Sequence, residues 1–219
     1  GIDSLLECPR CLWLYANENV NRPRGIFPSL PSGMDELFKN YFDKYITDGK
    51  LPPEIEGRID AKLFDDLGKL KVWRDIDFGR GGLYAEFPQF EIALRGAIDE
   101  LLVNDKGEFI PFDFKTRGYP IKEDTHEHYQ HQLDLYTLLF EKNGYKAAKN
   151  GYLLFFWPKN YVSGSAKFET ELVELSVSAA NGLKILQDVH DIVSGQIPQS
   201  HVKCEYCQYY SIYKDSFED

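Results

Sequence analysis

Two short stretches decide the fold, Gly96-Ala97-Ile98-Asp99 and Pro111-Phe112-Asp113-Phe114-Lys115-Thr116. Between them, Asn104-Asp105-Lys106-Gly107 has the residue types of a tight hairpin turn. We therefore predict two antiparallel strands, one from Phe90 to Asn104 and one from Glu108 to Lys115.

The period of two along a strand separates the side chains of the second stretch. Phe112 and Phe114 fall on one face, whereas Asp113 and Lys115 fall on the other. The hairpin brings Asp99 beside Asp113, so that two carboxylates and one ammonium meet. Hard divalent cations favour such oxygen clusters, and a cation-activated water beside a lysine is suited to phosphodiester hydrolysis. Taken alone, an Asp-x-Lys sequence is more often an ordinary solvated strand face.

Helices and strands are interleaved along the rest of the chain. Periodicity predicts helices at 4–16, after Ser32-Gly33, at 125–143 and at 177–194, and strands at 151–157 and 167–175. Residues 55–77 give mixed signals. This order predicts an α/β fold in which helices flank a central mixed sheet, as a single domain over residues 1–219.

Composition sets limits on location and partners. Of the 219 residues, 43% are hydrophobic, which is enough for a core, and the formal net charge is −10. That charge argues against a nucleic-acid footprint over the whole surface, but it is compatible with a local basic groove or with a bound cation. No run approaches the roughly 20 apolar residues that span a bilayer, and Gly1-Ile2-Asp3-Ser4 lacks the regions of a signal peptide. We expect a cytoplasmic protein that does not bind membranes.

The four cysteines form two Cys-x-x-Cys pairs, Cys8 with Cys11 and Cys204 with Cys207. In an intracellular chain this spacing favours a metal site over disulfides. Four thiolates suit either tetrahedral Zn²⁺ or an iron-sulfur cluster. Such a site, formed by segments 4–16 and 201–210, joins the two ends of the chain and restricts the unfolded state.

Together these motifs resemble the PD-(D/E)XK nuclease superfamily, specifically its RecB-like branch, which includes CRISPR-associated exonucleases. Asp99, Asp113 and Lys115 match the central motif of that branch, and Gln132 and Tyr136 match its Gln-x-x-x-Tyr helix. The resemblance implies a restriction-endonuclease-like core and catalytic roles for all five residues. Core packing is an equal interpretation of Tyr136, because it belongs to an apolar stripe at helical spacing.

The resemblance also implies a catalytic Mg²⁺ or Mn²⁺, for which we predict the ligands Asp35, Asp99, Asp113 and Phe114. The family places a histidine or an acid on an early helix as a further ligand. This chain has no histidine there, and Asp35 is preferred over Glu36 as the nearest match. An acid favoured by the helix dipole explains either residue equally.

The beginning Cys8-Pro9-Arg10-Cys11 also resembles those exonucleases, in which one early cysteine joins three late ones around an iron-sulfur cluster. This chain departs from that scheme, because Tyr213 stands about where the third late cysteine is expected, and Cys11 restores the count of four. The resemblance therefore favours iron and sulfur, whereas the two-plus-two spacing favours zinc. We predict an iron-sulfur cluster, with Zn²⁺ as the alternative.

These features predict a Mg²⁺- or Mn²⁺-dependent deoxyribonuclease that acts as an exonuclease on single-stranded or end-containing DNA, in repair, recombination or defence. The resemblance suggests a helicase or a CRISPR or repair protein as a partner. One alternative is a catalytically inactive module on the same scaffold that binds nucleic acid or docks proteins. Another is an acidic protein-interaction domain stabilised by zinc.

Overall fold

The structure is a computed structural model that describes the chain except residues 1–5, 24, 26–27, 78–79 and 216–219. The chain groups into two compact units. The sheet unit comprises Pro28–Pro88 and Ala93–Leu183, and the cysteine unit comprises Gly1–Phe27, Gln89–Ile92 and Lys184–Asp219. The single domain expected for residues 1–219 stays a prediction.

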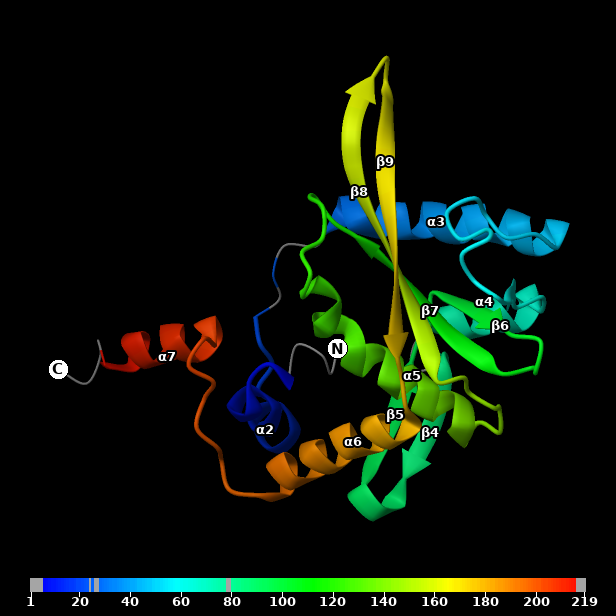
Figure 1. The fold of residues 1–219 in the computed structure, drawn as a ribbon. Coiled ribbons are helices and arrows are strands. Elements are labelled where there is room, and N and C mark those ends of the chain that lie inside the picture. Colours follow the sequence, from blue (N-terminus) through cyan, green and yellow to red (C-terminus); the bar gives the residue numbers. More distant parts are fainter. Residues whose placement is uncertain (1–5, 24, 26–27, 78–79, 216–219) are drawn as a thin grey trace. The chain divides into compact units, whose positions relative to one another are not determined.

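A mixed sheet forms the centre of the sheet unit (Figure 1). Its strand order is β1-β6-β7-β8-β9, and the strands are β1 (Lys62–Leu63), β6 (Glu100–Val103), β7 (Phe109–Thr116), β8 (Asn150–Val162) and β9 (Ser165–Ser176). The central strand β7 runs antiparallel to β6 and parallel to β8. The predicted α/β class, with helices flanking a mixed sheet, is confirmed.

The predicted hairpin is present as β6 and β7. Its register pairs Glu100 with Phe112, and the Asn104 side-chain oxygen caps the turn by accepting from the amides of Lys106 and Glu108 at 3.0 and 2.9 Å. At Gly107 φ is 73°, a conformation that favours glycine.

The single strand predicted from Phe90 to Asn104 is wrong. Its first part is β5 (Ile92–Gly96), which pairs with β4 (Leu83–Phe87) in a separate two-stranded sheet. Periodicity did not reveal the break because the chain is apolar on both sides of it. Residues 97–99 connect the two sheets and place Asp99 immediately before β6.

Helices contact β7 through different side chains. Helix α3 (Ser29–Asp48) places the Phe42 ring 5.7 Å from that of Phe112 and 4.6 Å from that of Phe114. Helix α5 (Gln130–Lys142) follows a 3₁₀ turn, η2 (Thr125–Tyr129), and its side chains bond Asp113 and Lys115. The predicted alternation of faces along β7 is therefore confirmed, with the phenylalanines toward α3 and the charged residues toward α5.

The ambiguous stretch 55–77 contains β1, helix α4 (Leu67–Arg74) and β2 (Ile76–Asp77), which pairs with β3 (Arg80–Gly81). Asp66 caps α4, since its carboxylate accepts from the Lys69 amide at 2.9 Å. Mixed signals in the sequence thus reflect a mixture of short elements.

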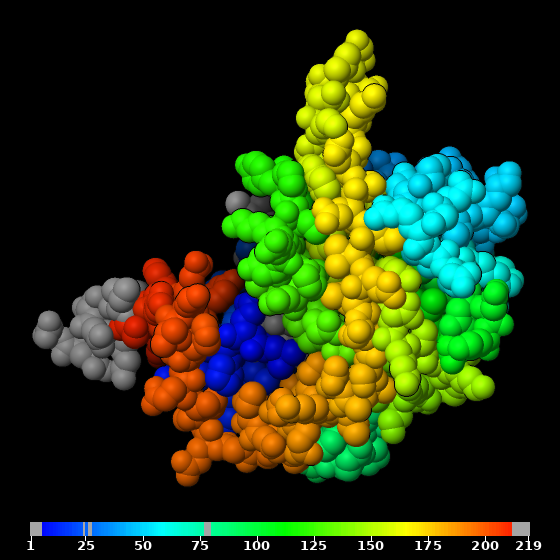
Figure 2. Space-filling model, viewed as in Figure 1, coloured from blue at the N-terminus to red at the C-terminus, as the bar shows by residue number. Residues whose placement is uncertain are grey.

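Strands β8 and β9 are longer than the predicted 151–157 and 167–175. The additional residues form a two-stranded arm that stands out from the sheet unit (Figures 1 and 2). Residues 158–167 are all exposed, so the apolar pattern that identified the buried part of each strand is missing there.

The cysteine unit contains α2 (Pro9–Glu18), the C-terminal part of α6 (Ala179–Ser194) and α7 (Glu205–Asp215). Residues 4 and 5 of the predicted first helix lie outside the described residues. Trp13 Nε1 donates to the Gly195 carbonyl at 2.8 Å, which fixes α2 beside the end of α6. Within the part of the chain that the structure describes, no helix is long and apolar enough to span a membrane.

Candidate active site and metal centre

The two carboxylates and the lysine singled out from the sequence lie together at the end of β7. Asp113 is 1% exposed, and its Oδ2 forms an ion pair with the Lys115 ammonium. Asp99 reaches the same strand, because its Oδ2 accepts from the Phe114 amide at 3.3 Å. The hairpin therefore brings the three side chains together as expected, although Asp113 is buried and not on a solvated face.

Gln132 on α5 connects the members of this cluster. Its Oε1 accepts from Lys115 Nζ at 2.9 Å, and its Nε2 donates to Asp113 Oδ1 at 3.1 Å and to the Tyr136 hydroxyl at 2.8 Å. The Tyr136 hydroxyl donates to the carbonyl of Ala97 at 2.6 Å. Gln132 and Tyr136 thus link α5 to the charged face of β7 and to the connection that carries Asp99.

Tyr136 is 7% exposed, so its ring also packs in the core. The two interpretations of this residue, packing and a place in the polar cluster, therefore both describe its surroundings.

The charges in the cluster influence one another. Burial, and next the Asp99 carboxylate, raise the pKa of Asp113 well above its ordinary value, and Lys115 only partly opposes them. Burial lowers the pKa of Lys115, but the neighbouring groups, chiefly the Asp113 carboxylate and also that of Asp99, together outweigh burial and the net shift is upward. Lys115 therefore remains an ammonium. A cation near Asp113 would stabilise the charged form of its carboxylate, which burial disfavours.

Helix α3 contributes Lys39, which no sequence motif indicated. Its Nζ lies 2.7 Å from Asp35 Oδ2 and 3.1 Å from Asp99 Oδ1. Asp35, the predicted early-helix ligand, is thus linked to the cluster through this ammonium, and its role as a metal ligand stays a prediction. The i, i+4 spacing of Asp35 and Lys39 was a signal for their ion pair, but nothing local pointed to Asp99.

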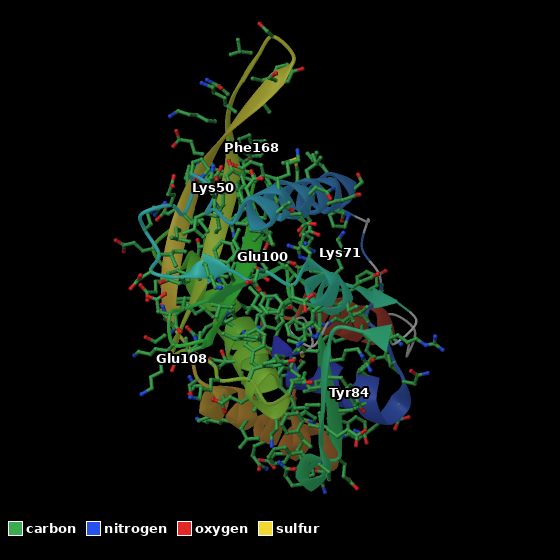
Figure 3. All side chains as sticks on the ribbon, turned by 90° about the vertical axis from the view of Figure 1, so that its right-hand side faces the viewer. Lys50, Lys71, Tyr84, Glu100, Glu108 and Phe168 are labelled. Carbon is green, nitrogen blue, oxygen red and sulfur yellow. The ribbon has the colours of Figure 1, made fainter. Side chains whose placement is uncertain are left out.

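Arg74 of α4 contacts the residues at the start of β6. Its Nε donates to the Asp99 carbonyl at 2.7 Å, its Nη1 lies 2.5 Å from Asp43 Oδ1, and its Nη2 lies 2.7 Å from Glu100 Oε2. Glu100 is fully buried and lies inside the sheet unit (Figure 3). This network holds the backbone at Asp99, and it too was absent from the sequence-based predictions.

The sequence matches a known protein family. The model of the PD-(D/E)XK nuclease superfamily matches residues 29–212. The chain belongs to this superfamily. Membership implies a phosphodiester hydrolase that acts on nucleic acid, while placement in the RecB-like branch stays a prediction. A search of curated proteins found no match. The crystal structure of SSO0001 is similar at 18% identity, with 96% of this chain and 82% of that chain covered and a TM-score of 0.46.

The donor set in this superfamily member fits a divalent cation. Asp113 Oδ2 is buried and accepts no hydrogen bond of ordinary geometry from the described residues, although the Lys115 ammonium pairs with it. A divalent cation bound by Asp99 and Asp113 would supply an activated water and neutralise charge on a phosphate. The side chain of Phe114 is buried, so only its backbone lies at the cluster.

The second cluster lies in the cysteine unit. The Sγ atoms of Cys8, Cys11, Cys204 and Cys207 all lie within 4.8 Å of one another, and they are free thiols. Among the described residues this is the group of three or more histidine, cysteine or acidic side chains whose ligand atoms lie close enough to share one ion. The predicted four-cysteine cluster that joins the two ends of the chain is confirmed.

Helix starts position these sulfurs. Cys8 immediately precedes α2 and Cys204 immediately precedes α7, so each Cys-x-x-Cys pair lies on the first turn of a helix. The free amides of a first turn favour negative charge, here a thiolate. Burial raises the pKa of Cys8, but a hydrogen bond from the His201 amide at 3.3 Å contributes to a net lowering to about 7.

Proposed function

We propose that the protein is a cytoplasmic, Mg²⁺- or Mn²⁺-dependent deoxyribonuclease that hydrolyses single-stranded DNA or DNA ends, in repair, recombination or defence. A helicase or a CRISPR or repair protein is the partner we propose for it. The observation that carries the proposal is the convergence of Asp99, Asp113, Lys115 and Gln132 at the end of one central strand.

Each residue has a distinct proposed role. Asp99 and Asp113 supply carboxylate oxygens for the cation, together with Asp35 and the backbone of Phe114. The charged Lys115 orients the attacking water or stabilises negative charge that develops on the phosphate oxygens.

Gln132 and Tyr136 complete the proposed site. Because Gln132 bonds both Lys115 and Asp113, it fixes the direction of the ammonium. Tyr136 holds Gln132 and the carbonyl of Ala97 in place. Pre-set geometry of this kind is what a catalytic ammonium needs.

The test is degradation of labelled single-stranded and duplex DNA in Mg²⁺ and in Mn²⁺. Lys115→Ala should lower the rate by about 10²-fold or more, as removal of a charge-stabilising group does. Lys149→Ala is the matched control, since this exposed lysine precedes β8 at the end of the strand away from the arm. Equal rates for the two variants would refute the assigned site.

A second candidate is a catalytically inactive module that binds nucleic acid or docks proteins. The observation that favours it is the Lys39 ammonium, which lies 3.1 Å from Asp99 Oδ1 where a cation is expected. Mn²⁺ binding that Asp113→Asn abolishes, in a folded protein without turnover on any DNA, would establish this candidate over the enzyme. Absence of Mn²⁺ binding would instead favour an acidic interaction domain.

For the cysteine cluster we propose a single structural Zn²⁺. The four Sγ atoms lie within 4.8 Å of one another, and three of their six pairs are closer: Cys11 with Cys204 at 3.6 Å, Cys11 with Cys207 at 3.6 Å and Cys8 with Cys207 at 3.9 Å. A tetrahedral site with Zn–S bonds of about 2.3 Å places its sulfurs about 3.8 Å apart. An iron-sulfur cluster, which the family resemblance favoured, needs more room because several iron and sulfide atoms lie between the thiolates.

Metal content decides between the two. The isolated protein should hold one zinc per chain and show no visible absorption, and replacement by Co²⁺ should produce thiolate charge-transfer bands. Iron together with acid-labile sulfide in the isolated protein would overturn the zinc assignment in favour of the cluster.

A further inference from the structure

The arm formed by residues 158–167 lies on the continuation of the strand next to the active site. Strand β8 pairs Phe155 with Lys115 and Phe156 with Thr116, and the Arg117 amide then donates to the Phe156 carbonyl at 2.8 Å. Beyond this point β8 continues to Val162 without β7 beside it. Lys115 is level with Phe155, so at a rise of about 3.3 Å per residue Val162 lies roughly 23 Å past it.

Its composition differs from that of the whole chain. The arm, Pro158-Lys159-Asn160-Tyr161-Val162-Ser163-Gly164-Ser165-Ala166-Lys167, contains two lysines and no acidic residue, although the chain carries a net charge of −10. At its base, Lys159 forms an ion pair with Glu169. The arm itself therefore carries two positive charges and no negative one, and Glu169 at its base balances one of them through Lys159.

The arm makes no contribution to the core. All ten residues are exposed, with Tyr161 at 73% and Val162 at 62%. Side chains become less exposed at its base, where Phe168 lies (Figure 3). The centroid of the Phe168 ring is 6.4 Å from that of the Phe38 ring. A two-stranded ribbon without a packed face is marginally stable in water. Figure 2 shows it projecting freely from the sheet unit.

We propose that this arm holds the nucleic-acid strand on which the active site acts, with Lys159 and Lys167 at phosphates and Tyr161 stacked on a base. The proposal rests on the proposed function and specifies how its substrate is held. Backbone charge and aromatic stacking together are the chemistry by which proteins hold single strands without reading sequence.

Fluorescence anisotropy of a labelled single-stranded oligonucleotide tests the arm separately from catalysis. Binding is measured on protein that keeps the metal of its cysteine cluster. No Mg²⁺ or Mn²⁺ is added, so that cleavage does not interfere. The variant is Lys159→Glu with Lys167→Glu. The control is Lys106→Glu with Lys149→Glu, which makes the same charge change at exposed sites at the opposite ends of β7 and β8.

The arm variant should raise Kd at least about tenfold and lower the salt slope by about 1.4, since each single-strand phosphate contact contributes about 0.7. The control should change Kd by less than about twofold. Tyr161→Ala should raise Kd about tenfold with an unchanged salt slope, because stacking carries no charge. Unchanged urea midpoints show that each variant is folded, as expected for exposed residues.

Equal weakening by the arm variant and its control would overturn the proposal, because only net charge would then matter. Undiminished binding by the arm variant would overturn it too, and would indicate that the ribbon instead takes a protein partner. These outcomes leave the nuclease function standing if the wild-type protein cleaves DNA in Mg²⁺. DNA binding that depends on the arm, without cleavage in Mg²⁺ or in Mn²⁺, would support the proposed role of the arm and refute the proposed nuclease function.

Discussion

Removal of the Arg74 guanidinium should destabilise the protein in a pH-dependent way. Arg74 is 8% exposed in its side chain and contacts Asp43, Glu100 and the Asp99 carbonyl. Arg74→Met keeps the apolar stem but leaves the fully buried Glu100 without its cation. Breaking a buried ion pair from one side typically costs about 3–5 kcal/mol.

The pH dependence follows from Glu100. Burial raises its pKa from 4.5 to about 7 even though Arg74 opposes the shift. The folded protein therefore favours the protonated acid, and stability is lost as pH rises from 4.5 to about 7, by about 3 kcal/mol in total. Without Arg74 the pKa of Glu100 rises further, so the variant continues to lose stability above pH 7, where the wild type no longer does.

Urea unfolding at pH 5.5 and at pH 8.5 measures this effect. We expect Arg74→Met to lose about 3–5 kcal/mol at pH 8.5. The loss of stability should be about 2 kcal/mol smaller at pH 5.5. Glu100 is protonated there, so the variant loses mainly the hydrogen bonds of Arg74 and leaves no buried charge at Glu100 unpaired. In the Arg74→Met/Glu100→Gln double variant the difference between the two pH values should nearly disappear. An equal loss at both pH values in the single variant would show that Glu100 is not the buried charge that Arg74 compensates.

Four further substitutions have definite expected outcomes. Lys39→Met removes the ammonium 3.1 Å from Asp99 Oδ1 and should tighten Mn²⁺ binding about tenfold by calorimetry; unchanged or weaker affinity would contradict a competing role for Lys39. Cys207→Ser should release the structural metal and lower the melting temperature, and an unchanged metal content would exclude Cys207 as a ligand. Gly182→Ala should cost about 1–3 kcal/mol, since its new Cβ meets the Asp134 carbonyl at 2.7 Å. Gly33→Ala, in open space on α3, should instead stabilise by about 0.5–1 kcal/mol, and equal effects of the two glycine changes on urea midpoints would refute this packing argument.

Local rules were sufficient where a feature depends on neighbouring residues. The period of two placed Phe112 opposite to Asp113, and the residue types at 104–107 determined the turn. Helical spacing placed Gln132 and Tyr136 one turn apart, and the hydrogen bond between them confirms that geometry.

Local rules failed where the burial pattern gives no signal. The break between β5 and β6 lies inside an apolar run, so periodicity predicted a single strand there. The arm has no buried face, so the ends of β8 and β9 were missed. Helix α7 was missed as well, because its polar and aromatic residues form no clear apolar stripe.

The sequence by itself determined the candidate site residues: the motif around Asp113 and Lys115, and two cysteine pairs with metal-ligand spacing. Only the tertiary structure decided what surrounds them. Lys39 reaches Asp99 from α3, and Arg74 reaches the Asp99 carbonyl from α4. Periodicity describes which way a side chain points from its own element. It does not describe which distant element packs there, and that packing sets the charge and the burial of the site.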